Sequence, residues 1–560
     1  MSAVADPFDA RRAVRATGLL RAFNDAGLLL AAEVHVAARL AALAGDEDES
    51  VKLAVALAVR GPRLGHVFVD LATIRDSATV ESDEPVDLSE LPWPAPGDWL
   101  SAVRASPLVA VGEDDDDGGS GEPAPLRLLG TRLYLDRYWR DERSVAADLN
   151  ALTAAHRLEV IAGGPGTGKT TKVAQMVAEL MVQDEAREVR PPLVALAAPT
   201  GKAAVRLQEA VHDESAGLST LRASTLHRLL GWRPGSHSRF AHDRANRLPH
   251  DVVIVDETSM VSLWLMARLV EAVRPDARLV LVGDPDQLAS IEAGVVLADI
   301  VSAAHGVVLL EQVHRFGGGI AGLAAAIRAG DGDATVDALS SAPDGVTWLP
   351  VDPSEGRESE LRLVRERAVA AGRAVTIAAR AGAAREALDA LGAFRLLCAH
   401  RRGPYGVGDW TMRVQGWLGA EISDLDLEQR DYVGRPLLIT DNDYELGLYN
   451  GDTGVIVQDP DGHASAAFER GRELLHFSPL RLGAVDTVYA MTIHKSQGSQ
   501  FDTAAVLLPP ADSRLLTREL LYTAVTRARH ELILVGAEDA VRSAVARPVA
   551  RASGLADRLR

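Results

Sequence analysis

A glycine-rich segment between an apolar run and a helical pattern constrains the fold of this chain more than any other feature. Residues 163–170 read Gly-Gly-Pro-Gly-Thr-Gly-Lys-Thr, which fits the pattern G-x-x-x-x-G-K-[ST]. The apolar run Leu158–Ala162 before it predicts a buried strand, and Thr171–Met181 after it predicts a helix. Strand, loop and helix in this order are typical of a phosphate-binding loop in a parallel α/β sheet.

The residue types of this loop fit the chemistry of a nucleoside triphosphate. Glycines let backbone N–H groups converge on phosphate oxygens, and the N-terminus of the following helix adds a favourable dipole. Lys169 is placed to bridge the β- and γ-phosphates, and the hydroxyl of Thr170 to ligate Mg²⁺. We therefore predict that ATP and Mg²⁺ are bound by Gly163, Gly164, Pro165, Gly166, Thr167, Gly168, Lys169, Thr170 and Thr171.

A second apolar run ends in two acids and predicts the metal side of the same site. Val252–Val255 predicts a buried strand, which would place Asp256 and Glu257 at its C-terminal end. Asp256 is expected to hold Mg²⁺ through water, and Glu257 to polarise the attacking water. A paired acid at this point is typical of hydrolytic motors rather than kinases. The alternative is that Asp256 only terminates the strand.

The composition excludes several other classes of protein. The chain has 560 residues, 47% of them hydrophobic, which is enough for several buried cores. Its single cysteine, Cys398, excludes an internal disulfide and a multi-cysteine metal site. The net charge of −19 argues against coating of nucleic acid by bulk charge, and no apolar stretch is long enough to span a membrane. We expect a cytoplasmic protein without membrane contact.

Short strands alternate with helical patterns in two sets, which predicts two parallel sheets with helices on both faces and hence an α/β fold. Upstream of them, residues 1–105 are rich in Ala, Leu and Val at helical spacing, and Leu126–Tyr138 alternates like a short strand pair. The acidic run Glu113–Asp117 is expected to be a solvated linker. The predicted strands of the two sheets are Leu158–Ala162, Leu193–Ala198, Val252–Asp256, Leu279–Gly283, and then Ala374–Ala379, Phe394–Ala399, Thr503–Leu508, Glu531–Val535.

Seven segments in a fixed order resemble the successive motifs of superfamily 1 helicases. The sequences of these segments are most similar to the RecD family of superfamily 1B. The members of this family are the alpha subunits of RecBCD (exonuclease V) complexes. The resemblance is strong over about residues 158–540 and weaker in the N-terminal region, through Gly18–Asn24. The segments are Ala198–Lys202, Ser224–Arg228, Asp256–Met260, Val282–Leu288, Leu310–Phe316, Thr492–Gly498 and Tyr522–Arg529.

The resemblance implies an architecture and a function. It implies a helical N-terminal docking domain (1–105), an acidic linker and short connector (106–150), and two RecA-like P-loop motor domains (151–335 and 336–560). A small β-rich, SH3-like insertion is expected at about residues 410–480 of the second motor domain. The implied activity is ATP-dependent 5′–3′ DNA translocation and unwinding at double-strand breaks, in recombinational repair. The implied partners are DNA, a RecB-like motor-nuclease and a RecC-like scaffold.

Further site residues follow from these motifs. The amide of Gln287 is expected to sense the γ-phosphate, and Arg315 and Arg527 to act as arginine fingers from separate segments. Trp232, Phe316 and Tyr522 are possible stacking faces for bases, although each aromatic is more often a core residue. Contacts to DNA phosphates are expected from Thr200, Lys202, Thr225, His227, Thr492, His494 and Lys495.

Several alternatives stay open at this point. No glutamine precedes Gln175, so the usual adenine contact upstream of the loop is missing. Either Asn150 or His156 substitutes for it, or selection for ATP is loose. The chain could be an ATP-gated assembly subunit that is not a motor. It could also be a stand-alone RecD-like helicase, a relaxase-type helicase or an RNA helicase. No cluster of acids and lysine typical of a nuclease stands out, so nuclease activity is expected in a partner.

Overall fold

The structure is a computed structural model of the 560-residue chain. It describes most of the sequence, and every statement below concerns these residues. The described ranges are 10–78, 80, 88–113, 124–185, 191–214, 216–233, 240–290, 292–303, 306–310, 318–422, 424–443, 445–471 and 473–560.

The N-terminal region is a helical domain with a small mixed sheet. The order of the strands in this sheet is β1-β4-β3-β2, in which β2 and β3 are parallel and the other pairs antiparallel. The expected strand pair within 126–138 is present as β3 and β4. The elements are α1 (Gly18–Asp25), α2 (Ala31–Ala44), α3 (Glu49–Arg60), η1 (Gly61–Leu64), β1 (Phe68–Asp70), α4 (Ile74–Ser77), α5 (Pro96–Ala105), β2 (Val109–Val111), β3 (Leu126–Leu129) and β4 (Arg132–Leu135).

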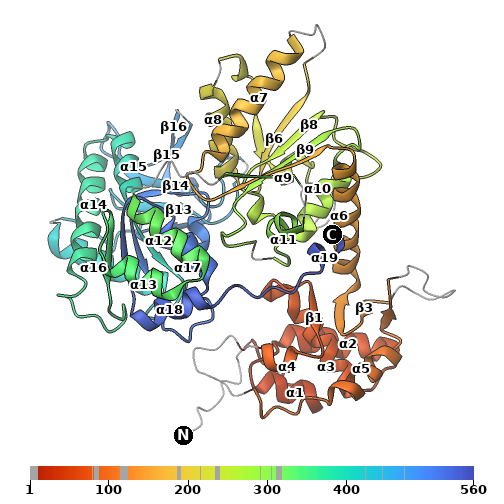
Figure 1. The fold of residues 1–560 in the computed structure, drawn as a ribbon. Coiled ribbons are helices and arrows are strands. Elements are labelled where there is room, and N and C mark those ends of the chain that lie inside the picture. Colours follow the sequence, from red (N-terminus) through yellow and green to blue (C-terminus); the bar gives the residue numbers. More distant parts are fainter. Residues whose placement is uncertain are drawn as a thin grey trace.

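The connector to the first motor domain is a long helix, α6 (Asp136–Ala154), rather than a short link. One face of α6 is apolar and joins the core of the first motor domain through Val145, Leu149 and Leu152. Figure 1 shows α6 rising from the N-terminal domain and running along the side of the first motor domain, next to α10 and α19. The acidic run is described only at Glu113, and the rest of it lies outside the described residues.

The first motor domain contains a parallel sheet with strand order β10-β5-β9-β8-β6-β7. The four strands predicted for this sheet are present as β5, β6, β8 and β9. The domain consists of β5 (Leu158–Gly163), α7 (Lys169–Glu185), β6 (Val194–Ala198), α8 (Gly201–Glu214), η2 (Ala216–Leu218), β7 (Ala223–Thr225), α9 (Leu226–Leu229), β8 (Val252–Val255), η3 (Thr258–Met260), α10 (Leu263–Ala272), β9 (Arg278–Gly283), α11 (Val296–Ala303) and β10 (Val307–Leu310).

Both faces of this sheet are covered by helices, because side chains along its strands alternate between two cores. Ile254 and Val280 pack with residues of α7 and α8 on one face. Val253 and Leu281 pack with residues of α6, α10 and α11 on the other face. Burial on both faces explains why these strands read as continuous apolar runs in the sequence.

The second motor domain contains a parallel sheet with strand order β11-β20-β19-β12-β18. Helices α12, α13, α17 and α18 cover one face, and α14 and α16 cover the other. The domain contains α12 (Gly318–Ala329), α13 (Gly332–Ser340), β11 (Val346–Leu349), α14 (Arg362–Arg380), α15 (Ala384–Ala393), β12 (Phe394–Cys398), α16 (Val407–Glu421), β18 (Ala490–Thr492), η5 (His494–Ser496), β19 (Phe501–Leu507), α17 (Arg518–Val525), β20 (Ala528–Val535) and α18 (Glu538–Ala546).

Two features of this domain differ from the sequence prediction. The expected strand Ala374–Ala379 lies inside α14, because the buried residues Val364, Ala368, Val375 and Ala379 recur at helical rather than alternating spacing. The predicted domain boundary at residue 335 falls inside α13. Since α12 and α13 pack on the second sheet, the described part of this domain begins at Gly318.

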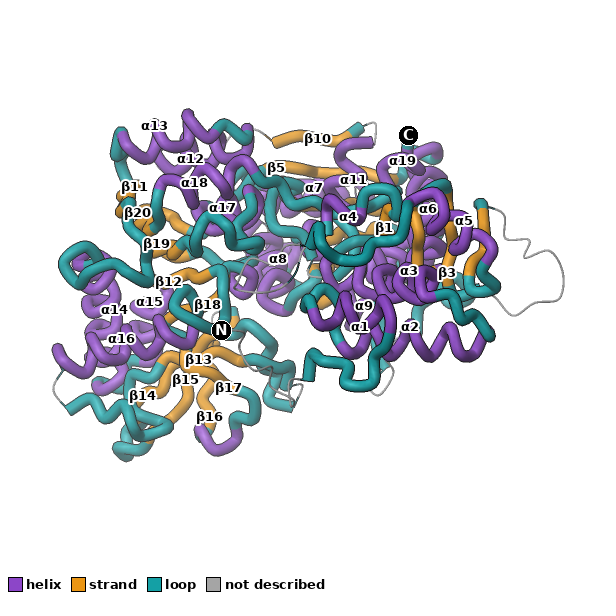
Figure 2. Tube along the Cα trace, turned by 90° about the horizontal axis from the view of Figure 1, so that it is seen from below, coloured by secondary structure: helices purple, strands orange, loops and turns teal. Residues whose placement is uncertain are grey.

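An antiparallel sheet lies within the second motor domain, beside α14 and α15 (Figure 2). Its strand order is β16-β15-β14-β13-β17. Residues 407–421, which the prediction placed in the β-rich insertion, form α16 instead, and the strands begin only at Pro436. The elements are β13 (Pro436–Ile439), β14 (Thr453–Gln458), β15 (Ala464–Arg470), β16 (Glu473–Phe477), η4 (Pro479–Arg481) and β17 (Val485–Thr487).

The C-terminal segment leaves the second motor domain after α18 and returns to the first (Figure 1). Its last helix, α19 (Leu555–Leu559), packs on α6 and α11, and Leu555 is fully buried there. Nowhere in the described part of the chain is there a helix with the length and apolarity to cross a membrane.

Candidate nucleotide and nucleic-acid site

The phosphate-binding loop follows β5 as predicted. Gly166 and Gly168 have φ values of 78° and 81°, in the left-handed region that side chains disfavour, so the loop requires glycine at both positions. The ammonium of Lys169 donates to the carbonyl oxygens of Gly163 (2.6 Å) and Gly164 (2.8 Å), which holds it inside the loop. The ammonium of Lys169 therefore lies within the phosphate loop, where two backbone carbonyl oxygens position it.

The two residues predicted to hold Mg²⁺ lie next to each other. The hydroxyl of Thr170, in the first turn of α7, donates to Asp256 Oδ2 over 3.4 Å. Burial and the neighbouring charge of Glu257 raise the pKa of Asp256, while Lys169 opposes this shift. A hydroxyl beside a carboxylate at the end of a phosphate loop fits the hard oxygen ligands that Mg²⁺ prefers.

Glu257 takes an unusual backbone conformation directly after β8. Its φ is 52°, and its N–H donates to Asp256 Oδ1 over 2.8 Å. A left-handed glutamate costs free energy that the surrounding structure must offset, and such residues gather at functional sites.

The loop after β9 carries Gln287 and joins the two motor domains. Gln287 Nε2 donates to Asp284 Oδ2 over 2.9 Å, and both side chains are buried. The next residue, Leu288, donates its N–H to Thr523 Oγ1 of α17 (2.9 Å) and accepts from Gln497 Nε2 (2.6 Å). Gln287 is therefore held at the seam between the two domains.

Arg527 is buried on the second-domain side of this seam. Its guanidinium donates to Thr523 O (2.9 Å), Ser499 O (3.3 Å) and Thr526 Oγ1 (3.2 Å). Burial lowers the pKa of Arg527, and the carboxylates of Glu257 and Asp284, both from the first domain, counter this shift. These two acids therefore act electrostatically on Arg527 across the seam. Arg315 and Phe316 lie outside the described residues.

Lys202 lies in the interface between the two domains and not in an open, solvent-filled groove. Its ammonium donates to Ser499 Oγ of the second domain over 2.8 Å, and Arg206 donates to the carbonyl of Gly498. Burial, together with the charges of Arg206 and other arginines, lowers the pKa of Lys202 to about 7. Of the residues predicted to contact DNA, Lys202 is thus placed in a contact between the domains.

A groove of about 1140 Å³ lies between α8, β7 and α9 of the first domain and the antiparallel sheet of the second. Thr225, His227 and Trp232 line the first-domain wall, and Tyr449 and Arg470 line the other. Thr225 Oγ1 also caps α9 by accepting from the N–H of Arg228. Polar donors and aromatic rings in one groove are suited to a nucleic-acid strand.

The remaining residues predicted to contact DNA lie outside the groove, and two of their hydroxyl groups accept local hydrogen bonds. Thr200 Oγ1 accepts from the N–H of Ala203 (3.2 Å) at the start of α8. Thr492 is buried, and its hydroxyl accepts from the N–H of Lys495 (3.2 Å). His494, in η5, has its pKa lowered by burial and by the charges of Arg551 and Arg401. These residues do not line the groove.

The two substitutes proposed for the adenine contact lie elsewhere. Asn150 is on α6, where its side chain donates to the carbonyl of Arg558 over 3.3 Å. His156 precedes β5, whereas the phosphate loop follows it, and six strand residues at about 3.3 Å each separate the two ends. His156 therefore lies at the opposite end of β5 from the phosphate loop, and Asn150 is bonded to the C-terminal helix.

Sequence reasoning missed two residues of the site. Asp284 was part of a recognised segment but received no role, although an acid directly after an apolar run is the same signal that marked Asp256. Tyr522 is a possible stacking face in the sequence but more often a core residue, and the structure buries its ring in the core of the second domain. Its hydroxyl donates to Asp284 over 3.3 Å, a contact that the sequence does not indicate.

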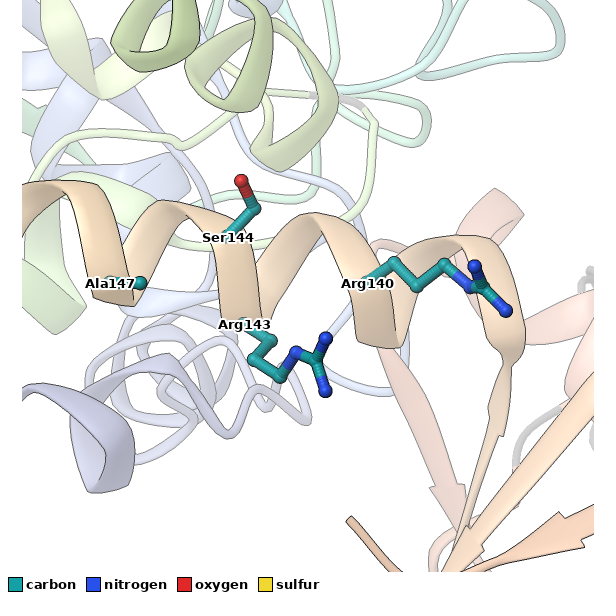
Figure 3. A pocket seen from close by; sticks show the side chains of 4 residues that line it. All are labelled: Arg140, Arg143, Ser144 and Ala147. Carbon is teal, nitrogen blue, oxygen red and sulfur yellow. The ribbon is translucent and has the colours of Figure 1, made fainter. Parts of the chain in front are cut away.

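Another pocket, of about 420 Å³, lies on α6 and is lined by Arg140, Arg143, Ser144 and Ala147 (Figure 3). Arg140 pairs with Asp136 at 2.5 Å, and the guanidinium of Arg143 lies 4.5 Å from the ring centre of Trp139. These arginines are engaged within α6 and its surroundings.

Comparisons with protein families cover all three parts of the chain. Residues 25–134 match the N-terminal domain of RecBCD enzyme subunit RecD. Residues 144–348 match an AAA domain, and residues 487–535 match a UvrD-like helicase C-terminal domain. The matches therefore fall on the helical N-terminal domain and on both motor domains.

The chain is 50% identical to RecBCD enzyme subunit RecD of Mycolicibacterium smegmatis, over 97% of this chain and 99% of that protein. It is 33% identical to the ATP-dependent RecD2 DNA helicase of Deinococcus radiodurans, over 73% of this chain and 51% of that protein. Among solved structures, Bacteroides Pif1 bound to single-stranded DNA is 18% identical over 70% of this chain and 91% of that chain, with a TM-score of 0.39. The chain therefore belongs to the RecD family of RecBCD subunits, and with it to the ATP-dependent DNA helicases.

Proposed function

We propose that the chain is the 5′–3′ translocating subunit of a RecBCD-type helicase–nuclease that acts at DNA double-strand breaks in recombinational repair. Its partners would be a RecB-like motor-nuclease and a RecC-like scaffold. The observation that supports the proposal is that groups of both domains meet beside the phosphate loop. The hydroxyl of Tyr522, from the second domain, donates to Asp284 of the first over 3.3 Å, and the charge of Glu257 of the first domain acts on Arg527 of the second.

Such a shared site can convert hydrolysis into movement. Bound ATP with Mg²⁺ would be held by Lys169, Thr170 and Asp256, and Mg²⁺ would supply charge neutralisation at the phosphates. Glu257 would accept a proton from the attacking water, and Arg527 would stabilise charge that develops on the transferred phosphoryl group. Since Arg527 belongs to the other domain, its approach draws the two domains together.

The DNA strand is proposed to follow the groove between the domains. Thr225 and His227 of one wall and Arg470 of the other would contact phosphates, and Trp232 offers an aromatic face. Lys202, Thr200, Thr492, His494 and Lys495 would join these contacts only after local rearrangement. A groove with one wall from each domain changes width whenever the domains move.

A helicase assay with the purified complex tests this proposal. We expect strand displacement from a duplex with a 5′ tail, and Lys169→Ala in this subunit should abolish that displacement together with the share of ATP turnover that this subunit contributes. Lys172→Ala, exposed one turn further along α7, is the matched control and should leave both unchanged.

Three outcomes would contradict the proposal. Displacement that survives Lys169→Ala would indicate an assembly subunit that is not a motor. Stimulation of ATP turnover by RNA alone would indicate a different substrate. A requirement for a 3′ tail would reverse the polarity.

A further inference from the structure

The carboxylate of Asp284 receives hydrogen bonds from both motor domains. Asp284 is fully buried, with 0% of its surface exposed. Its Oδ2 accepts from Gln287 Nε2 of the first domain (2.9 Å) and from the Tyr522 hydroxyl of the second (3.3 Å). Its Oδ1 accepts from the N–H of Asp286 (3.1 Å). Burial raises the pKa of Asp284, and the charge of Lys169 opposes the shift.

This arrangement fixes the orientation of the Gln287 side chain. A carboxylate only accepts hydrogen bonds, so the amide must present its NH₂ group to Asp284. The carbonyl oxygen Oε1 of Gln287 then points away from Asp284 and is left to accept a hydrogen bond from another group. If the carboxylate of Asp284 were displaced, the amide of Gln287 could rotate, and its carbonyl oxygen would no longer be held in this orientation.

Tyr522 also lies against the phosphate loop. A Cβ atom added at Gly164 would stand 2.9 Å from the Tyr522 hydroxyl, closer than real Cβ atoms approach. The next residue, Thr523, accepts the N–H of Leu288 on the loop that carries Gln287. One turn of α17 therefore contacts both the phosphate loop and the loop after β9.

We propose that Tyr522 is a positioning residue for ATP hydrolysis. Its hydroxyl fixes the carboxylate of Asp284 and, through it, the amide of Gln287, so that turnover depends on α17 being seated on the first domain. This inference deepens the proposed function, because it rests on hydrolysis at the same nucleotide site. In this proposal the hydroxyl of Tyr522, from the second domain, affects hydrolysis through Asp284 and does not touch the nucleotide.

Tyr522→Phe tests the role with the smallest change, since the buried ring stays. We expect the kcat of DNA-stimulated ATP hydrolysis to fall about tenfold while the KM for ATP changes less than about twofold. Tyr432→Phe is the matched control, because it removes another buried hydroxyl, 2.9 Å from that of Tyr489 in the same domain. The control should leave kcat unchanged, and both variants should unfold within about 2 °C of the wild type.

A double-mutant cycle with Asp284→Asn separates positioning from general damage. If Tyr522 acts through Asp284, the double variant should be no slower than the slower single variant. Additive losses, or an unchanged kcat in Tyr522→Phe, would overturn the proposal. A fall in melting temperature that accounts for lost activity would also overturn it.

Gly164→Ala provides an independent measurement. The new methyl group would push the Tyr522 hydroxyl away, so Gly164→Ala should lower kcat more in the otherwise wild-type protein than in the Tyr522→Phe variant. An equal loss in both proteins would contradict the contact. All these assays follow ATP turnover, so a complex that hydrolyses ATP without displacing a strand would refute the proposed function and leave this inference to be decided separately.

Discussion

The two interfaces of the first motor domain differ in polarity. The interface with α6, the N-terminal domain and the C-terminal segment is a continuous apolar core, to which Phe68, Trp139 and Leu555 contribute. The interface with the second motor domain is mostly polar. Its described contacts include hydrogen bonds of Asp284, Leu288, Lys202 and Arg206. Leu288 is a first-domain side chain that packs in the core of the second domain.

Because of this difference, separating the apolar interface costs much more free energy than separating the polar one. Exposing apolar surface costs about 25 cal/mol per Å², so a large free energy opposes separation of the first interface. Hydrogen bonds exchanged with water contribute only about 0.5–1.5 kcal/mol each, so the second interface can open and close. The groups that respond to nucleotide lie at the second interface, where little free energy opposes movement.

Glu257→Gln should produce the largest change in ATP turnover. It alters a group beside the polar interface and leaves the apolar interface unchanged. The amide keeps the size of the side chain but cannot accept the proton of the attacking water, so turnover should fall about 100-fold or more. Equilibrium binding of nucleotide and the melting temperature should stay near the wild-type values. An unchanged rate would assign the role of base to another group.

Arg558→Ala should affect the apolar interface alone. Arg558 contacts Glu142 (3.4 Å), whose side chain has 0% exposure, and also pairs with Glu113 (2.9 Å). Removing the guanidinium leaves a buried carboxylate with less compensation, so we expect the melting temperature to fall by about 5 °C. Turnover at 25 °C should not change, and a loss of kcat would show that the two interfaces are coupled.

Arg560→Ala is the control for this variant. Arg560 is exposed and lies 3.6 Å from the exposed Asp557, so its ion pair should contribute little to stability. We expect a change in melting temperature of less than about 1 °C, measured by the same thermal scan. A larger fall would mean that removing any C-terminal charge is destabilising, independent of the buried pair.

Asp299→Asn should give the smallest effect, visible only in the pH dependence of stability. Burial raises the pKa of Asp299 to about 6, Glu142 and Asp557 add repulsion, and its carboxylate accepts from Ser553 Oγ (2.7 Å). Because the folded pKa lies above the ordinary value, ionised Asp299 disfavours the folded state above pH 6, and this penalty disappears as the pH falls towards 4.

The asparagine variant should therefore melt a few degrees higher than the wild type at pH 8, and by a clearly smaller margin at pH 4.5. Thermal scans at the two pH values measure this difference. An equal shift at both values would show that the charge of Asp299 is not the cause.

Much of the first sheet is predictable from the sequence. Its strands are buried on both faces and so appear as apolar runs, and its phosphate loop requires particular residues at fixed spacing. The phosphate loop and Asp256 are marked by local patterns, and the structure brings Thr170 and Asp256 within hydrogen-bond distance. The strands β5, β6, β8 and β9 were likewise visible as short apolar runs with turn residues behind them.

The remainder depends on contacts between distant segments, which local patterns do not contain. The β-branched run at Val375–Ile377 was taken for a strand, although its burial follows helical spacing. The position of Tyr522 beside Asp284 joins residues 238 positions apart, and only the packing of α17 on the first domain determines it. The path of the C-terminal segment back to α6 is likewise set by tertiary packing.

The account rests on Arg527 acting on a nucleotide held by the other domain, and Arg527→Lys tests this most directly. The substitution keeps the charge but removes the planar fork of the guanidinium. We predict that kcat for ATP falls about 100-fold while nucleotide affinity stays within about threefold, and that Arg529→Lys, on an exposed arginine paired with Asp502, changes neither. A wild-type kcat in Arg527→Lys, with an unchanged melting temperature, would contradict a nucleotide site shared by the two motor domains.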